Sequence, residues 1–380
     1  MGHESNAGNS VLIVSQRQRS DGFGRQPGYV AFGEAEDVLA AGADADMAMI
    51  DHSLTHPRIR ARRLGGRVAR RVIHDERPFP SVPGFHRRVP LTRDHYDLAV
   101  FIGFTTWDLP LLERMTEVRE RADRVVAWFP EAWVSDLDDD RVHHEPFGML
   151  NALFVGNRPA AERLSVLAPC PVHHLPPAVD VDHFSTLTVD DPRPIDVLGI
   201  GRRDPRLHRA LVEWSRKTNR LYIYDTVSGA VVSDAAAHRA NLGDLYRRTN
   251  IAITNFAKWD LPEVTRGYRE IPGRLWEALA AGAVMVGKSP GEDLQLDLVG
   301  DIIVNEIPEQ PSQAVELIHE LAKADTSALR RAQVRSALLG HDWSHRWAQV
   351  FNSSGLDTPV GLQGRLDRLE AMAASIKPPD

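Results

Sequence analysis

An arginine-rich turn is one of two places in this sequence where residue types and spacing point to chemistry. Gly201, Arg202 and Arg203 follow an apolar run expected to be a strand, and Arg206 comes three residues later. Glycine lets the backbone approach a ligand, and a helix beginning near Pro205 favours an anion. Arginine adds forked donors that suit a diphosphate. We interpret the turn as a phosphate site, although an ordinary strand-to-helix turn with solvated arginines has the same pattern.

The second place is Glu277, a carboxylate inside the apolar segment IPGRLWEALAAGAVMVG at residues 271–287. Pro272 suits the first turn of a helix, Gly282 suits its left-handed end, and a run typical of a buried parallel strand follows. Arg274 and Glu277 share one face of that helix. The carboxylate could pair with Arg274, or it could accept hydrogen bonds from the two hydroxyls of a ribose. We favour the ribose, because the helix is otherwise too apolar to face solvent.

Candidates for a catalytic group lie elsewhere in the chain. Glu131 and Trp133 follow a strong strand pattern at residues 124–129, and His183 lies in a proline-rich segment. A general base or a sugar-orienting group requires such a carboxylate or imidazole near the reacting atoms. Glycines within residues 22–28 would let a substrate approach the end of the first strand. The alternative is that these residues only pack loops, with Trp133 in the core.

Composition argues against several classes of function. The 380 residues carry a net charge of −7, so general binding to nucleic acid is not expected. No run approaches the roughly 20 apolar residues that span a bilayer, and the N-terminus lacks a signal-peptide core, so we expect a cytoplasmic protein with no stable membrane insertion. The single cysteine, Cys170, excludes an internal disulfide. Residues 136–140 look like a solvated acidic loop, and the histidine pairs lack zinc spacing, so no metal site is expected.

The order of apolar runs predicts an α/β protein with two doubly wound, Rossmann-like units. In the first unit strands are expected at residues 11–15, 46–50, 97–104, 124–129, 152–155 and 172–175, and helices at 29–39, 109–122 and 160–167. Residues 52–94 are interpreted only as a basic helix and a long loop. In the second unit strands are expected at residues 196–199, 221–224, 251–254, 284–286 and 301–305, and helices at 205–218, 235–249, 272–281, 312–323 and 326–339. Two such units would face each other across a cleft lined by the carboxyl ends of their strands.

The chain resembles the group 1 glycosyltransferases of the GT-B fold, and most closely their spore-maturation-type branch. Four segments carry the resemblance: PPAVDVDHF at residues 176–184, GIGRR at 199–203, RLWEALAAGAVMVG at 274–287 and HDWSHRW at 341–347. They resemble the family's P-x-G-V-D-x-x-x-F hinge, its v-G-R turn, its E-A-L-A-x-G segment and the W-x-x-r segment before its last helix. All four lie in the second half, whereas the first half matches only in its alternation of strands and helices.

The resemblance implies a nucleoside-diphosphate-sugar donor such as a UDP-sugar, bound as substrate with no cofactor. The acceptor, a small molecule, a glycan or a protein, is not identified. Arg202 would meet the diphosphate and Glu277 the ribose. The further donor-binding candidates are Gly201, Arg203, Arg206, Asn255, Lys258 and Arg274. The implied domains are residues 1–177 on the acceptor side, 178–345 on the donor side, and a helical tail, 346–380, that packs back on the first domain. Transfer is expected to be metal-independent and retaining.

One position departs from the family's pattern. Many of these enzymes have another glutamate eight residues before the ribose glutamate, where this chain has Arg269, and Glu270 follows one position later. Glu270 therefore joins Glu131 and His183 as a catalytic candidate. The lysine that usually partners the diphosphate arginine is not evident, and Arg206 or Lys258 would replace it. Two alternatives stay open: a sugar-nucleotide epimerase or hydrolase, and a sugar-nucleotide-binding partner that has lost activity.

Overall fold

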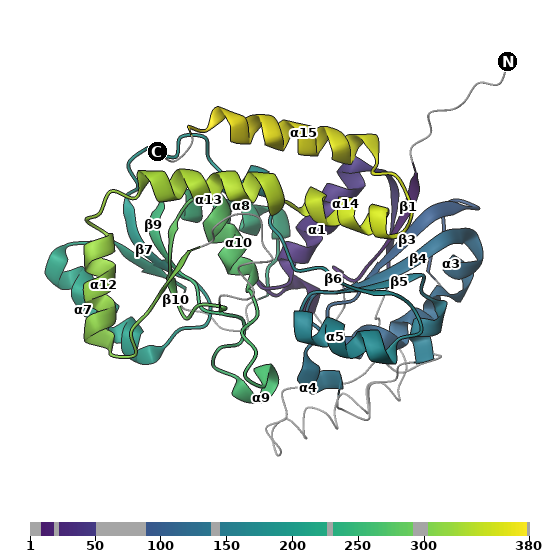
Figure 1. The fold of residues 1–380 in the computed structure, drawn as a ribbon, viewed down its shortest axis with the longest axis horizontal. Helices are drawn as coiled ribbons and strands as arrows, with labels where there is room; N and C mark the ends of the chain where they lie inside the picture. Colours follow the sequence, from purple (N-terminus) through teal and green to yellow (C-terminus); the bar gives the residue numbers. More distant parts are fainter. Residues whose placement is uncertain are drawn as a thin grey trace. The chain divides into compact units, whose positions relative to one another are not determined.

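The computed structural model describes residues 9–18, 23–50, 89–137, 145–225, 231–291 and 303–377. These residues form two compact units (Figure 1). The first contains the described residues up to Pro176 together with Ala348–Leu362, and the second contains Pro177–Trp347 and the residues from Gln363 onward. Most of the basic segment expected at residues 52–94 and most of the acidic loop at 136–140 lie outside the described ranges.

The first unit is built around a parallel sheet, which has six strands within the described residues in the order β2-β1-β3-β4-β5-β6. The strands are β1 (Ser10–Ser15), β2 (Asp44–Met49), β3 (Tyr96–Ile102), β4 (Ala122–Phe129), β5 (Ala152–Val155) and β6 (Val172–His174). Ser10 is in register with Asp44, and Val126 with Ala152. All six strands predicted for this unit are confirmed, with bounds that shift by one or two residues.

Helices cover both faces of this sheet. They are α1 (Val30–Gly42), α3 (Thr116–Arg121), α4 (Val134–Leu137) and α5 (Arg158–Leu167), with 3-10 helices η1 (Phe23–Arg25), η2 (Thr106–Met115) and η3 (Glu145–Met149). Successive strand residues point to opposite faces. Trp128 accordingly packs against Phe32 of α1, with ring centroids 5.6 Å apart, whereas Phe129 packs against Phe101, at 5.9 Å. The alternation divides the apolar side chains of β4 between two layers.

The helix predicted at residues 109–122 is replaced by a 3-10 helix, η2, followed by the short α3. Thr105 and Asp108 form a reciprocal capping box at the start of η2, and Asp108 also accepts a hydrogen bond from the N–H of Phe104, at 2.9 Å. Pro110 has no N–H to donate to the carbonyl four residues earlier, so an α-helix would lack a bond there. Apolar periodicity located this segment correctly but did not reveal its tighter winding.

The second unit has its own parallel sheet, which the described residues form from five strands in the order β11-β10-β9-β7-β8. The strands are β7 (Ile195–Gly199), β8 (Tyr222–Tyr224), β9 (Thr249–Ile253), β10 (Val284–Gly287) and β11 (Val304–Glu306). The strand order reverses between β7 and β9. Loops that leave the carboxyl ends of β7 and β9 therefore diverge at this point, which is where open α/β sheets bind ligands.

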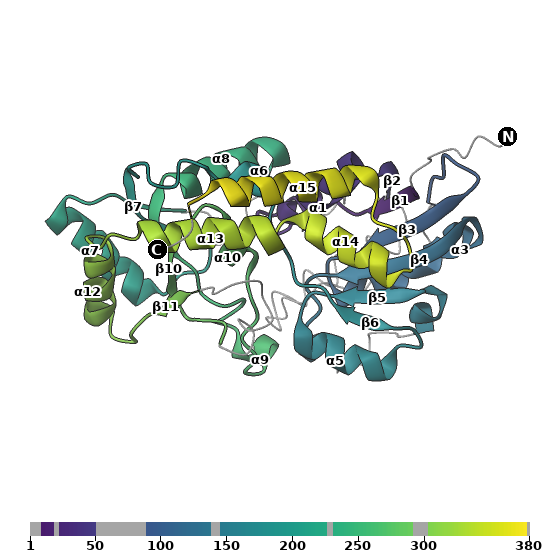
Figure 2. The same ribbon diagram turned by 45° about the horizontal axis from the view of Figure 1, so that its top comes forward.

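Two layers of helices enclose the second sheet (Figure 2). One face carries α8 (Ala235–Arg247), α10 (Gly273–Ala280) and α13 (Ser327–Gly340), whose buried side chains include Tyr246, Leu279 and Val334. The other carries α7 (Pro205–Thr218) and α12 (Pro311–Leu321), with Trp214 and Ile318. Two short helices, α6 (Val181–Phe184) and α9 (Pro262–Thr265), complete the unit. The doubly wound architecture predicted for each half is confirmed.

The C-terminal tail is divided between the two units, which differs from the prediction that residues 346–380 pack together on the first domain. Helix α14 (Trp343–Ser353) begins in the second unit and ends in the first. Helix α15 (Val360–Ser375) lies alongside α13 (Figures 1 and 2), and its residues from Gln363 onward belong to the second unit. Leu369 and Ala373 join that unit's core, and Arg335 of α13 donates to the carbonyl of Ile376 at 3.2 Å. Apolar contacts thus keep this part of α15 on the second unit.

Arg365 ties three stretches of the second unit together. Its guanidinium donates to both carboxylate oxygens of Asp342, at 2.8 and 2.7 Å, and to Asp180 at 2.7 Å. Asp182 lies 3.1 Å away and is also bound by Arg368. These residues stand next to the positions where the chain passes from one unit to the other, so the network fixes the local backbone at all three passages.

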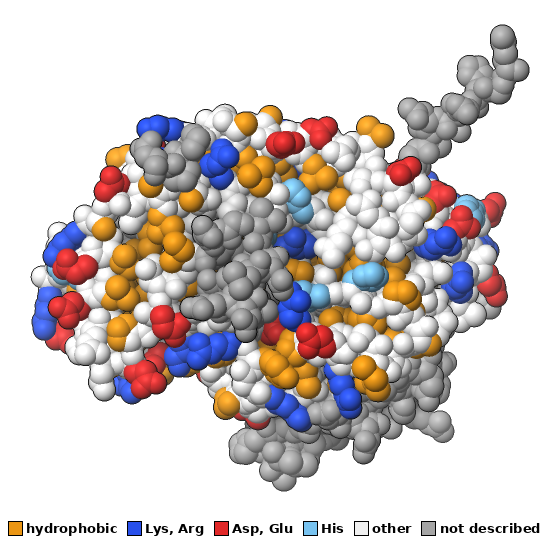
Figure 3. All heavy atoms as spheres, in the orientation of Figure 1, with side chains coloured by type: hydrophobic (Ala, Val, Ile, Leu, Met, Phe, Trp, Pro, Cys, Tyr) orange, Lys and Arg blue, Asp and Glu red, His pale blue; other side chains and the backbone are white. Residues whose placement is uncertain are grey.

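The surface mixes both signs of charge. On the face drawn in Figure 3, the coloured Lys and Arg side chains lie interspersed with Asp and Glu, and apolar side chains fill the areas between them. Within the described ranges, no helix has the length and apolar character needed to cross a membrane.

Candidate functional site

The turn after β7 is held against the start of α10. Gly201 has a φ of +92°, which only glycine adopts without strain. A Cβ built at this position would lie 2.8 Å from Nε of Arg274, the second residue of α10. The backbone of the turn and this guanidinium therefore meet at the carboxyl edge of the sheet. The structure brings together two residues that the sequence analysis assigned to the same site.

Each arginine of the turn is paired with a carboxylate. Arg202 is exposed and lies 3.0 Å from Asp260, in the loop after β9. Arg203 lies 3.1 Å from Asp225 and packs over the ring of Tyr224, with 5.3 Å between the guanidinium carbon and the ring centroid. The Asp225 carboxylate also accepts a hydrogen bond from the N–H of Gly201, at 3.0 Å.

The start of α7, which the sequence offers as an anion site, is occupied by the protein's own carboxylate. Asp204 is the N-cap, and its side chain accepts from the N–H groups of Arg206, at 2.7 Å, and Leu207, at 3.4 Å. Partial burial acts to raise the pKa of Asp204, but these N–H groups and the guanidinium of Arg206 outweigh it and lower that pKa. An anion bound at this helix start would compete with the Asp204 carboxylate for the same N–H groups. Arg206 contributes to the cap through its backbone N–H.

The loop after β9 holds two further donor-binding candidates. Asn255 accepts a hydrogen bond from the N–H of Lys288 through its side-chain oxygen, at 2.9 Å, which joins the ends of β9 and β10. Lys258 has a left-handed backbone, with φ of +52°, and its carbonyl accepts from the N–H of Leu261 at 2.8 Å. The ammonium of Lys288 lies 4.2 Å from the centroid of Trp259. Asn255 thus has a clear structural role, and Lys288 adds a cation to this edge that the sequence analysis did not select.

Glu277 is buried within α10 rather than on an exposed face. It is 5% exposed, and its Oε1 lies 2.5 Å from Nη1 of Arg239, which is itself 2% exposed. The pairing with Arg274 that the sequence leaves open does not form. Burial, and next the charge of Glu277, raise the pKa of the Tyr246 phenol, whereas the guanidinium of Arg274 acts to lower it. The side chain of Glu277 is thus part of a buried polar group beneath the turn.

Glu270 and Arg269 occupy different environments. Glu270 is 4% exposed, and its carbonyl accepts a hydrogen bond from the N–H of Ala257 at 2.8 Å. Arg269 is exposed, packs over Phe256 at 5.4 Å, and donates to the carbonyl of Ser289 at 3.4 Å. A cation therefore holds the place where the resemblance leads one to expect a carboxylate.

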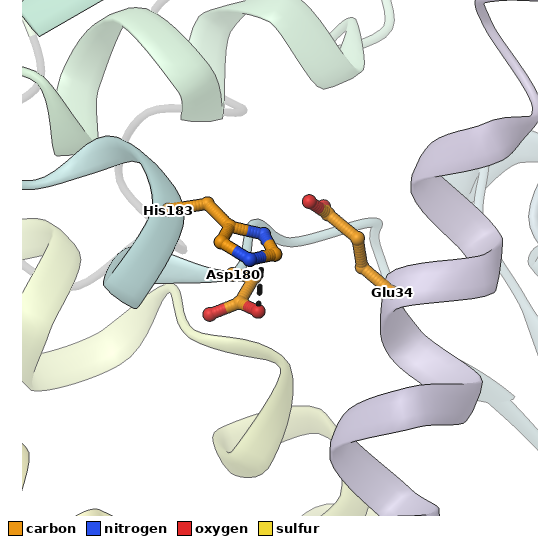
Figure 4. A group of neighbouring side chains, drawn as sticks. All are labelled: Glu34, Asp180 and His183. Atoms are coloured by element: carbon orange, nitrogen blue, oxygen red, sulfur yellow. Dashed lines mark ion pairs between the residues drawn. The ribbon is translucent and has the colours of Figure 1, made fainter. Parts of the chain in front are cut away.

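The other catalytic candidates are described within their own units. His183 lies on α6 in the second unit, and Figure 4 shows its ring beside Asp180, with Nδ1 3.4 Å from the carboxylate. Glu131 follows β4 in the first unit, where its Oε2 accepts from the indole N–H of Trp133 at 3.2 Å. Trp133 is buried, as the packing alternative expected.

Sequence reasoning missed Arg239, Asp225 and Asp260. Arg239 lies 38 positions from Glu277 along the chain, inside the helix after β8. No local spacing links it to α10. Asp225 follows an apolar run, so its place at a strand end could have been inferred from the same rule that selected Gly201.

Comparison with known proteins agrees with this geometry. Residues 194–352 match a family model described as "Glycosyl transferase-like". The match begins just before β7 and ends in α14, so it covers nearly all of the second unit's sheet and site. Among curated proteins, no sequence matches this chain.

Solved structures extend the comparison to the first unit. The alpha,alpha-trehalose-phosphate synthase (UDP-forming) from Burkholderia vietnamiensis aligns with a TM-score of 0.51 and 12% identity over 94% of this chain and 99% of that chain. The chain has the GT-B fold. Anabaena Alr3699/HepE, solved in complex with UDP and glucose, aligns with a TM-score of 0.48 and 10% identity over 91% of this chain and 99% of its own. At 12% identity the likeness to the trehalose-phosphate synthase concerns the fold alone.

Proposed function

We propose that this protein is a glycosyltransferase that moves a sugar from a nucleoside-diphosphate sugar, with UDP as the nucleotide, to an acceptor. The observation that carries the proposal is the meeting of the Gly201 turn with Arg274 at the switch point of the second sheet. This is where an open α/β sheet binds a ligand, and the same region matches the glycosyltransferase-like family model. The structural neighbour from Burkholderia vietnamiensis is named as a UDP-forming enzyme.

In this proposal Arg202 and Arg274 bind the diphosphate. The pair between Arg202 and Asp260 is exposed, and such pairs contribute only about 0.2–1 kcal/mol. A diphosphate can therefore replace Asp260 at small cost. Negative charge grows on the leaving diphosphate as the glycosidic bond breaks, and guanidinium groups already in place lower that barrier. In this proposal the turn after β7 and the start of α10 hold Arg202 and Arg274 near the diphosphate before it binds.

Glu277 is proposed to bind the ribose. One carboxylate oxygen is used by Arg239, and the other, Oε2, has no hydrogen-bond partner among the residues that the structure describes. A buried carboxylate oxygen without a partner is costly, and a donor hydroxyl would remove that cost. The proposed role therefore supplies the missing partner.

We further propose that the transfer needs no metal, because arginine and lysine side chains at this edge supply the positive charge that a cation otherwise brings. The resemblance to group 1 glycosyltransferases supports the proposal that the transfer is retaining. Glu131, His183 and Glu270 remain the candidates for the catalytic group. The acceptor is proposed to be recognised by the first unit.

The proposal is tested by titrating the purified protein with UDP, GDP and TDP in a calorimeter and by thermal shift. At a nucleotide concentration of about 100 Kd, binding should stabilise the fold by about 2.7 kcal/mol. UDP-sugars are then incubated with a panel of acceptors while release of UDP is measured. The absence of binding to all three nucleotides would refute the donor assignment.

A second candidate function is nucleotide-sugar binding without transfer. Arg269 favours it, because a cation stands where related enzymes have a glutamate. Binding of UDP-sugars without UDP release over the whole acceptor panel would support this alternative. A sugar-nucleotide epimerase or hydrolase would instead convert the donor when no acceptor is present.

A further inference from the structure

A buried ion pair joins α8 to α10 in the second unit. Nη1 of Arg239 lies 2.5 Å from Oε1 of Glu277, and both side chains are almost fully buried. Burying two charges costs free energy that their attraction offsets only when the geometry is good. Two apolar residues would pack the same space without that cost. Because this buried pair has a desolvation cost, it suggests that the Glu277 carboxylate has a function beyond joining two helices.

The surroundings hold Arg239 in place. Its guanidinium lies 4.6 Å from the ring centroid of Phe184 on α6. Asp234 caps α8 by accepting from the N–H of Ala237 at 3.0 Å, which fixes the helix start one turn before Arg239. A planar guanidinium that packs on an aromatic ring has little freedom to turn. The direction from which it meets Glu277 is therefore set by the protein.

Arg239 orients the side chain of Glu277. By binding Oε1 it fixes the rotation of the carboxylate and leaves Oε2 without a partner among the described residues. A carboxylate held in one orientation, with one oxygen open, loses less conformational freedom on accepting a hydrogen bond from a hydroxyl than a freely rotating one does.

We propose that Arg239 is a positioning residue: it holds the Glu277 carboxylate in a fixed orientation, so that its open oxygen binds a ribose hydroxyl, and so makes the site prefer ribonucleotides to deoxyribonucleotides. This inference rests on the proposed function, because it requires a nucleotide in the site. It goes beyond that function by assigning the sugar discrimination of the nucleotide to a residue on a different helix.

The test compares UDP with 2′-deoxy-UDP by calorimetry on the full chain. The wild type should bind UDP about tenfold more tightly, as expected for one lost hydrogen bond to a charged group. Arg239→Gln should bring the two affinities to within about twofold. Both ligands carry the same diphosphate, so protonation of the diphosphate affects both affinities equally and does not change their ratio.

The ratio of the two affinities separates positioning from a structural role. A substitution that only destabilises the fold should weaken the binding of both nucleotides alike and leave the ratio unchanged, whereas loss of positioning should lower the ratio. Arg220→Gln is the control, because it breaks a different and less buried ion pair, with Asp196 at 2.5 Å at the amino end of β7, and should keep the wild-type preference.

A folded Arg239→Gln variant with the wild-type preference would overturn the inference. If that variant does not fold, Arg239→Lys carries the same test: it keeps the charge but not the planar fork, so a reduced preference supports positioning and an unchanged one overturns it. Failure of the wild type to bind UDP is a distinct outcome that rejects the proposed function itself. Equal binding of UDP and 2′-deoxy-UDP by the wild type rejects only the inference.

Discussion

Arg202 and Asp260 form an ion pair of 3.0 Å across the point where the strand order of the second sheet reverses. The arginine leaves the end of β7, and the aspartate belongs to the loop that leaves β9. Both are partly exposed, so the pair contributes little to stability. If Arg202 binds the diphosphate as proposed, Asp260 competes with the diphosphate for its guanidinium.

Removal of this guanidinium should weaken nucleotide binding. Arg202→Ala deletes a charged donor to the diphosphate, which contributes about 1.5–3 kcal/mol, so the affinity for UDP should fall by about tenfold or more. Asp260→Asn removes the competitor instead and should leave that affinity unchanged or raise it. Calorimetry on both variants checks the prediction, and an unaltered Kd for Arg202→Ala would contradict it.

A single methyl group at position 201 should damage the site by displacing Arg274. Gly201→Ala costs about 1–2 kcal/mol of backbone strain, and its Cβ would also press on the guanidinium of Arg274. Gly355→Ala is the control, because Gly355 also has a positive φ, of +71°, but a Cβ there meets nothing within 4 Å. Both variants should lose similar stability in urea, whereas only Gly201→Ala should bind UDP more weakly. Equal affinities for the two variants would show that Arg274 is not required.

Removal of divalent cations should not affect the reaction if arginine and lysine supply the positive charge. The rate of UDP release from a UDP-sugar, measured with an acceptor that the panel shows to be active, should be the same in EDTA and in added magnesium or manganese. Activity that EDTA abolishes and either cation restores would reject metal independence. Nucleotide binding in EDTA, followed by calorimetry, shows whether the cation acts on binding or on transfer.

Most of the fold could be predicted from the sequence, because its strands are short apolar runs with clear boundaries. Residues 205–218 were predicted as a helix and form α7 with the same bounds. The 3-10 winding of η2 was missed because the helix was predicted from apolar spacing alone, which does not take into account the hydrogen bond that Pro110 cannot make.

The candidate site was accessible only in part. Local patterns identified Gly201 and Glu277, because each stands in a recognisable segment. They could not identify Arg239, which reaches Glu277 only through the packing of α8 on α10. They also predicted an anion site at the start of α7, although the Asp204 side chain already accepts hydrogen bonds from the N–H groups there. Partners that come from distant segments require the tertiary structure.

Acid should weaken the second unit through the arginine–aspartate network around Arg365. Asp342 is fully buried, which acts to raise its pKa, but the hydrogen bonds and charge of Arg365 outweigh burial and hold the pKa of Asp342 below its usual value. Hydrogen bonds from Arg368 likewise lower the pKa of Asp182. A carboxyl group with a lowered folded-state pKa contributes stability in full above its unfolded pKa of about 3.9, and loses it as the pH falls through the folded value.

Asp342→Asn should therefore be less stable than the wild type at pH 7 and less sensitive to acid. Breaking a buried pair costs about 3–5 kcal/mol, and the lower end applies here because Asp180 still binds Arg365. Urea midpoints measured from pH 7 to pH 3 should fall steeply below about pH 4 in the wild type and less in the variant. Glu213→Gln is the control, since its pair with Lys217 is exposed on α7, and it should keep the wild-type profile. Parallel profiles for the wild type and Asp342→Asn would show that Asp342 does not set the acid sensitivity.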